Sequence, residues 1–256
     1  MGLFRKKKKS TMFLAEQPQS LNTLHQNLTF TATEQYKLIR ANLDFTLPPD
    51  EKCPIIGITS SMRGEGKSTT AVNLSYVCAE KGKRVLLIDG DLRIPSVAKK
   101  MGIESNPGLV ELLMGDTTPL SHYQSSMLPN WYIIPAGTIP PNPSELLGSE
   151  RMEKLLKRLR EMFDYIIIDL PPVNIVSDAI AVSNLLSGMI VVVREEYTEK
   201  RELERCMRQL QLSEANILGC VMNAAKSGSG AYGKYKKYRY YSYSHYALSD
   251  TKGKKQ

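Results

Sequence analysis

Short runs of consecutive apolar residues alternate with longer amphipathic stretches along most of this 256-residue chain. The short runs are rich in Ile, Val and Leu and apolar throughout, which is typical of strands buried on both faces of a sheet. The longer stretches carry apolar residues at helical spacing. We predict strands over residues 54–59, 84–91, 131–137, 165–169, 189–194 and 217–223. We predict helices over residues 33–45, 67–81, 107–115, 144–163, 177–186 and 199–212.

Strands that alternate with helices in this way indicate an α/β fold, with a mostly parallel sheet covered by helices on both faces. In such sheets ligands bind at the carboxyl ends of the strands. The pattern covers residues 27–226, which we predict to be one domain. Residues 1–26 and 227–256 lack the periodicity, and we predict that they are a flexible basic arm and a disordered, tyrosine-rich tail.

The positive charge is concentrated at the two ends of the chain. The formal net charge is +8, to which residues 1–26 contribute +4 and residues 227–256 contribute +6, so that residues 27–226 carry −2. A domain without excess positive charge is not expected to bind nucleic acid. The lysine run 6–9 has two interpretations: a solvated charge cluster, or a segment attracted to an anionic membrane surface.

The cysteines and the apolar runs indicate the environment of the protein. No two cysteines form a C-x-x-C pair and none has a histidine nearby in sequence, so we expect reduced thiols and no cysteine metal site. The four are Cys53, Cys78, Cys206 and Cys220. No apolar run approaches the about 20 residues that span a membrane. The sequence therefore predicts a cytoplasmic protein.

The most specific chemical signal is the segment SMRGEGKST, which follows a predicted strand and opens a predicted helix. It matches the phosphate-loop pattern G-x-x-x-x-G-K-[ST], with serine in place of the first glycine. Gly64 and Gly66 let backbone N–H groups turn toward a phosphate. Lys67 can reach the β- and γ-phosphates, and the Ser68 hydroxyl can hold Mg²⁺. We predict that the whole loop binds ATP: Ser61, Met62, Arg63, Gly64, Glu65, Gly66, Lys67, Ser68 and Thr69.

Three carboxylates stand at the carboxyl ends of predicted strands. Asp169 ends YIIID, where a Walker B carboxylate would orient Mg²⁺; a turn or capping residue is the simpler alternative. Asp89 and Asp91 are two positions apart, so in an ideal strand they point to the same side and need a cation or a shared proton. One could contact the metal while the other accepts a proton from an incoming hydroxyl. The predicted catalytic residues are Lys67, Asp89 and Asp91, and the predicted metal ligands are Ser68, Asp89 and Asp169.

Several segments together resemble the bacterial tyrosine kinases, a family of P-loop NTPases with deviant Walker motifs and a Rossmann-like sheet. TSSMRGEGKST resembles their Walker A loop, VLLIDGDLRIP their Walker A′ motif and YIIIDLPPV their Walker B motif, and IPPNPSELL resembles one of their loops. The resemblance implies an ATP- and Mg²⁺-dependent non-specific protein-tyrosine kinase that phosphorylates a C-terminal tyrosine cluster in trans. The implied acceptors are Tyr232, Tyr235, Tyr238, Tyr240, Tyr241, Tyr243 and Tyr246.

The resemblance also implies partners. The length of the chain is similar to that of the separate cytoplasmic form found with capsule and exopolysaccharide genes. That form is activated by a transmembrane adaptor of the polysaccharide co-polymerase type, which recruits it to the inner face of the plasma membrane. The resemblance also implies a cognate phosphotyrosine phosphatase. Glu34, Lys37 and Arg40 resemble the E-x-x-R-x-x-R motif through which the family forms a ring-shaped homo-oligomer in its unphosphorylated state. Lysine at position 37 lacks the bidentate fork of arginine.

Some alternatives stay open at this point. A non-kinase P-loop ATPase of the partition or septum type, which binds DNA or membrane complexes, is the second functional hypothesis. A salt bridge is as good an explanation of Arg93 as a catalytic role. Asn223, at the end of the last predicted strand, is a candidate adenine contact or a turn residue. Arg63 departs from the family pattern without an explanation.

Overall fold

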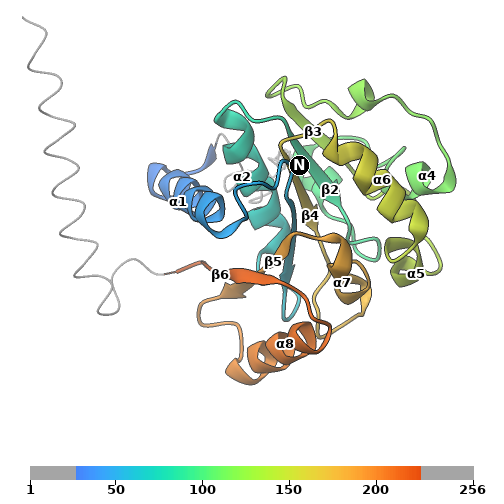
Figure 1. Cartoon of the computed structure of the whole chain (residues 1–256). Helices are drawn as coiled ribbons and strands as arrows, with labels where there is room; N and C mark the ends of the chain where they lie inside the picture. The colour runs from blue at the N-terminus through green and yellow to red at the C-terminus, as the bar shows by residue number, and fades with distance from the viewer. Residues whose placement is uncertain (1–26, 226–256) are drawn as a thin grey trace, which may run out of the picture.

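A six-stranded sheet forms the centre of the computed structural model, which describes residues 27–225 (Figure 1). The strand order is β3-β2-β4-β1-β5-β6, and every neighbouring pair is parallel. The predicted parallel α/β sheet is therefore confirmed. The strands are β1 (Ile55–Ser60), β2 (Val85–Asp89), β3 (Trp131–Ile134), β4 (Tyr165–Asp169), β5 (Gly188–Arg194) and β6 (Ile217–Asn223).

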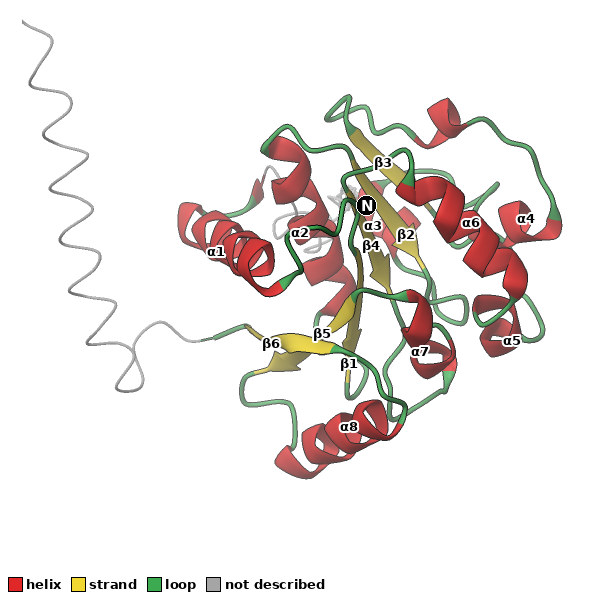
Figure 2. Cartoon of the chain, in the orientation of Figure 1, coloured by secondary structure: helices red, strands yellow, loops and turns green. Residues whose placement is uncertain are grey.

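Helices cover both faces of the sheet (Figure 2). They are α1 (Phe30–Thr46), α2 (Lys67–Glu80), α3 (Val97–Met101), α4 (Leu109–Met114), α5 (Pro143–Leu147), α6 (Glu150–Arg160), α7 (Asp178–Ala181) and α8 (Lys200–Leu212). Two 3₁₀ turns, Leu120–Tyr123 and Ser183–Leu185, also lie within the described residues. Helices α1, α2 and α3 pack on one face, and α4 to α8 pack on the other.

The central strand β1 shows why the strands are apolar throughout. All six of its residues are buried, because successive side chains point to opposite faces and both faces are covered. Ile56 and Ile58 contact the core beneath α1 and α2, whereas Ile55 belongs to the core beneath α6 and α8. The strand that leads into the phosphate loop is thus packed against a hydrophobic core on both of its faces.

Several predicted elements differ in detail from the structure. The single helix predicted over 144–163 is wrong: it is split at Gly148 into α5 and α6, and the Ser149 side chain caps α6 by accepting from the Met152 N–H. The first helix begins earlier than predicted and is capped by Thr29. The strand predicted to reach residue 91 ends at Asp89, so Asp91 lies in the following turn. Helix α3 and the 3₁₀ turn at 120–123 were not predicted.

Two groups of predictions fall outside the described residues. These are the basic arm at 1–26 and the tail with its seven tyrosines. Within residues 27–225, no helix has the length and apolar character needed to cross a bilayer.

Candidate active site

The phosphate loop joins the end of β1 to the start of α2 in the geometry that the motif predicts. Gly64 and Gly66 have φ of 80° and 99°, in the left-handed region that favours glycine. A Cβ on Gly66 would lie 2.0 Å from the Asn223 amide nitrogen, so the backbone passes too close for any side chain. Gly66 is also the N-cap of α2, and no side chain caps the helix there. The first N–H groups of α2 are therefore oriented as an anion cradle.

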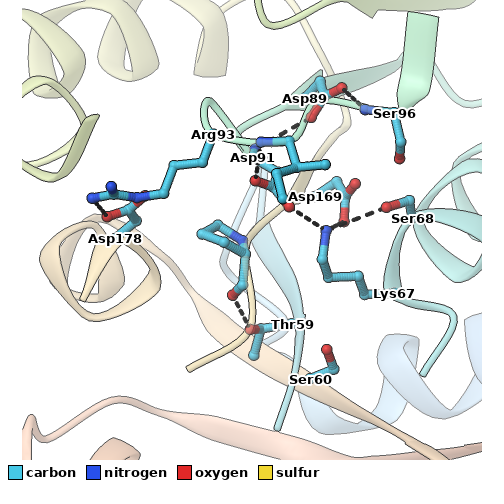
Figure 3. Close-up of polar contacts among 12 residues, drawn as sticks. Thr59, Ser60, Lys67, Ser68, Asp89, Asp91, Arg93, Ser96, Asp169 and Asp178 are labelled. Carbon is cyan, nitrogen blue, oxygen red and sulfur yellow. Dashed lines mark hydrogen bonds and ion pairs between the residues drawn. The ribbon is translucent and has the colours of Figure 1, made fainter. Parts of the chain in front are cut away.

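Lys67 lies among acidic side chains at the carboxyl ends of β2 and β4 (Figure 3). Its Nζ is 2.8 Å from Asp91 Oδ2, 3.4 Å from Asp169 Oδ1 and 3.3 Å from the Ser68 hydroxyl. Burial alone would lower the pKa of Lys67, but the charges of Asp169 and Asp91 outweigh it and raise that pKa. The lysine is therefore held cationic where a nucleotide's phosphates would meet the loop.

Asp169 fits the predicted role near a metal. It is fully buried, and its Oδ2 accepts no hydrogen bond. Burial raises the pKa of Asp169, while the charge of Lys67 and a hydrogen bond from Ser68 oppose that rise. An orphaned carboxylate oxygen beside a serine hydroxyl at a phosphate loop is the oxygen donor set that Mg²⁺ prefers. The residues present therefore fit a Mg²⁺-nucleotide, with Ser68 and Asp169 nearest to the cation.

Asp89 and Asp91 have different partners, and the ideal-strand expectation does not apply to them because β2 ends at Asp89. Asp91 lies beyond the strand and contacts Lys67, whereas the Asp89 carboxylate accepts the backbone N–H groups of Asp91, Ser96 and Val97 at 3.2, 3.0 and 2.9 Å. Burial, followed by repulsion from Asp169, raises the pKa of Asp89 to about 7. Asp89 thus organises the turn that carries Asp91.

Glu65 lies behind the loop. It is fully buried, and its carboxylate accepts the backbone N–H groups of Ser61 and Met62 at 2.8 and 3.1 Å and the hydroxyls of Ser61 and Thr198 at 2.7 Å each. Its side chain therefore braces the loop, and any contact of this residue with a phosphate comes from its backbone. Glu65 was predicted as an ATP-binding residue, and this bracing role was not predicted.

The end of β5 and the turn that follows it contact the outer side of the phosphate loop. The Tyr197 hydroxyl donates to the Arg63 carbonyl at 3.1 Å, and the Arg194 guanidinium donates to the Gly64 carbonyl at 3.0 Å. Arg194 also lies over the Tyr197 ring, 5.0 Å from its centroid. These residues were not predicted from the sequence, because a contact across 130 positions leaves no local pattern.

Asn223, the candidate adenine residue, contacts the loop itself. Its side-chain amide donates to the Glu65 carbonyl at 2.9 Å, and its Oδ1 accepts the N–H of Ala224. These bonds place the end of β6 against the phosphate loop. The remaining loop residues differ in exposure: Arg63 is exposed, and Met62 and Thr69 are partly exposed.

Arg93 forms the salt bridge that the sequence analysis left as an alternative. Its Nε and Nη2 donate to the two carboxylate oxygens of Asp178 at 2.8 and 2.9 Å, and it points away from Lys67 (Figure 3). Asp178 is fully buried and also accepts the Ser144 hydroxyl. This bidentate pair ties the loop after β2 to α5 and α7.

The three predicted oligomerisation residues do not act alike within the chain. Lys37 pairs with Glu34 at 3.0 Å on the exposed side of α1. Arg40 instead donates to the Val77 carbonyl of α2 at 2.6 Å, so it fastens one helix to the other. The exposed side of α1 also carries large apolar side chains, namely Phe30, Leu38 and Phe45.

Comparison with known proteins assigns this chain to a family. A family model described as an AAA domain matches residues 53–221. Tyrosine-protein kinase YwqD from Bacillus subtilis (strain 168) is 37% identical over 210 residues, which cover 82% of this chain and 84% of YwqD. The chain belongs to the bacterial tyrosine-kinase family. The P-loop NTPase fold predicted above is confirmed by this membership.

Solved structures of bacterial tyrosine-kinase domains superimpose on the fold. The chimerical protein CapA2B2 matches with a TM-score of 0.73 and 34% identity over 80% of this chain and 90% of that one. The kinase domain of the Escherichia coli tyrosine kinase ETK matches with a TM-score of 0.71 and 30% identity over 82% of this chain and 83% of that one.

Proposed function

We propose that this chain transfers the γ-phosphoryl group of ATP to tyrosine hydroxyls. The observation that carries the proposal is the position of Lys67, held between Asp91 and Asp169 at the mouth of a glycine cradle. Family membership makes tyrosine the acceptor, and the phosphate loop makes a nucleoside triphosphate the donor. Phosphoryl transfer requires positioning and charge stabilisation above all, and this arrangement is suited to both.

Each residue has a distinct part in the proposed reaction. The cradle N–H groups and Lys67 bind and orient the β- and γ-phosphates. Ser68 and Asp169 would hold Mg²⁺, which would neutralise developing charge. Asp91 accepts the proton of the incoming tyrosine hydroxyl. Asp89, anchored on three backbone N–H groups, keeps the turn that carries Asp91 in place. Its predicted direct contact with the metal belongs to the same proposal.

The acceptors we propose are the seven tyrosines of residues 232–246, presented in trans by a neighbouring copy. Each phosphate adds about −1.5 to −2 charges, so four of them cancel the +6 of residues 227–256. Phosphorylation then converts a basic segment into an acidic one and drives it away from the acidic site. A ring-shaped oligomer would dissociate by the same repulsion.

We propose three kinds of interaction partner for this chain. The exposed side of α1, with its Glu34–Lys37 pair and its apolar residues, is suited to contact between copies of the chain. A transmembrane adaptor of the polysaccharide co-polymerase type would recruit the cytoplasmic kinase to the membrane and couple it to capsule or exopolysaccharide synthesis. A cognate phosphatase would reset the tyrosines.

The deciding experiment is incubation with ATP and Mg²⁺ followed by mass spectrometry of residues 227–256. Phosphate on the tyrosines that disappears in Lys67→Met, but persists in the exposed control Lys200→Met, is the expected result. Release of inorganic phosphate with unmodified tyrosines would reject the kinase and favour the partition- or septum-type ATPase, which family membership already disfavours.

A further inference from the structure

Three successive carbonyl groups of the phosphate loop, those of residues 63–65, each accept a hydrogen bond from a side chain outside the loop. In chain order the donor–acceptor distances are 3.1, 3.0 and 2.9 Å. The three side chains, which we call the outer donors, are Tyr197, Arg194 and Asn223. Each lies 130 or more positions after the carbonyl that it contacts, so these hydrogen bonds exist only in the folded chain.

The outer donors determine where the N–H groups of the loop point. Each peptide unit is planar and trans, so its C=O and its N–H point in opposite directions. Carbonyl groups held outward at residues 63–65 therefore turn the N–H groups of residues 64–66 to the inner side of the loop. Gly64 and Gly66, with φ of 80° and 99°, supply the left-handed conformations found in backbone nests that bind anions.

The inward N–H groups are available to a ligand. Those of residues 64–66 have no acceptor within residues 27–225. The N–H groups of Ser61 and Met62 differ, because they donate to the Glu65 carboxylate behind the loop. Unpaired donors that are already held in one direction lose little conformational entropy when an anion binds.

The outer donors and the catalytic carboxylates stand on opposite sides of β1. Strands β5 and β6 follow β1 on one side of the sheet, and β4 and β2 follow it on the other (Figure 1). Arg194 and Asn223 end β5 and β6, whereas Asp169 ends β4 and Asp91 follows β2. The loop is therefore held from one side, and the carboxylates that serve the transfer step lie on the other.

We propose that the outer donors are positioning residues for the phosphates of the nucleotide. By holding the carbonyl groups of residues 63–65 outward, they direct the N–H groups of residues 64–66 at the β- and γ-phosphates. They act on the nucleotide through the loop backbone. The inference deepens the proposed kinase function and rests on it for the reaction, but the binding of phosphate groups can be measured separately.

The test measures the affinity for inorganic pyrophosphate in the presence of Mg²⁺ by calorimetry on the full chain, because pyrophosphate has no adenine. Tyr197→Phe removes the hydroxyl and keeps the ring on which the Arg194 guanidinium lies. Asn223→Ala removes the amide that donates to the Glu65 carbonyl. Each variant loses one neutral hydrogen bond to the loop, so each should bind pyrophosphate about 3- to 10-fold more weakly than the parent.

The matched control is Tyr36→Phe, which removes a hydroxyl from the half-buried tyrosine of α1 and should leave the affinity unchanged. Arg194 is not part of this comparison, because loss of its charge would weaken phosphate binding whatever the orientation of the loop. In the kinase reaction, Tyr197→Phe should raise the KM for ATP by the same factor as the pyrophosphate affinity falls. Its kcat should stay within about twofold of the parent value, because Asp91 and Asp169 are unchanged.

The outcomes separate positioning from a merely structural role. A lower urea midpoint in Tyr197→Phe and Asn223→Ala with unchanged pyrophosphate affinity would overturn the inference, and so would a fall in kcat at unchanged KM. Absence of pyrophosphate binding by the parent would reject the cradle and the inference together. If the parent binds pyrophosphate but transfers no phosphate to tyrosine, the kinase function fails, and the calorimetry still decides whether the outer donors position the loop.

Discussion

Glu65 provides the sharpest quantitative prediction, because its carboxylate is the only described acceptor for two backbone donors of the phosphate loop. Glu65→Leu keeps the approximate size of the side chain and removes both acceptor oxygens. The hydroxyls of Ser61 and Thr198 can rotate to other partners, but the N–H groups of Ser61 and Met62 cannot. A buried donor without a partner costs about 1–3 kcal/mol. Met62 is partly exposed, so we expect the two donors together to cost about 2–4 kcal/mol.

Glu65→Gln should be far milder. Its amide oxygen can accept both N–H groups, while its NH₂ donates to the hydroxyls that formerly donated to Glu65. Only the charge-assisted part of these hydrogen bonds is lost, which is about 1 kcal/mol. The free energy of unfolding of both variants is measured by urea denaturation, with the fluorescence of the single, buried Trp131 as the signal. With a slope of about 2 kcal/mol per molar urea, the leucine variant should unfold about 1–2 M earlier than the parent.

The comparison with glutamine is what makes the prediction refutable. Equal losses of unfolding free energy in Glu65→Leu and Glu65→Gln would contradict the reasoning. They would mean that the negative charge of Glu65, and not its acceptance of backbone hydrogen bonds, stabilises the loop. Glu104→Leu, at an exposed glutamate, is the control and should change stability by less than about 0.5 kcal/mol.

Three further predictions concern other parts of the molecule. Burial raises the pKa of all four thiols, and only Cys220 is exposed, so one thiol should react with a disulfide reagent in the native protein and four after unfolding in urea. Gly66→Ala should abolish ADP binding in calorimetry without unfolding the protein, because an added Cβ collides with Asn223 at a left-handed position; unchanged affinity would contradict the cradle geometry. For the Arg93–Asp178 pair, a double-mutant cycle with Arg93→Met and Asp178→Leu should give a coupling of about 1–3 kcal/mol in urea denaturation, whereas additive losses would show that the pair contributes no net interaction.

The parts of the fold that the sequence predicts are those set by local patterns. Strands β4 and β6 have the predicted bounds, because each is a continuous apolar run ended by a polar residue. The helix predicted over 144–163 failed because Gly148 breaks an otherwise helical spacing, and the break is favoured by the packing of α5 against α7 rather than by the pattern itself.

In the site, too, the features set by local sequence patterns were predicted and those set by tertiary contacts were not. The phosphate loop and Asp169 were recognisable because their chemistry depends on spacing along the chain. The different partners of Asp89 and Asp91 were not, since they depend on where β2 ends and on the backbone of the following turn. Nor could the partner of Arg93 be found, because Asp178 lies 85 positions away in a segment with no motif.

The central position of β1 has a consequence for how the chain acquires its activity during synthesis. Its hydrogen-bonded neighbours are β4 and β5, and Ile55 donates to the side chain of Ser187, 132 positions later. A ribosome adds about 5–20 residues per second, so β1 waits on the order of ten seconds for its second neighbour. Until β5 is made, a strand that is fully buried in the finished protein has one edge unpaired, which favours protection by a chaperone. The most recognisable motif of the chain is therefore translated early but becomes a binding site late, and a product truncated before β5 would carry the motif without the activity.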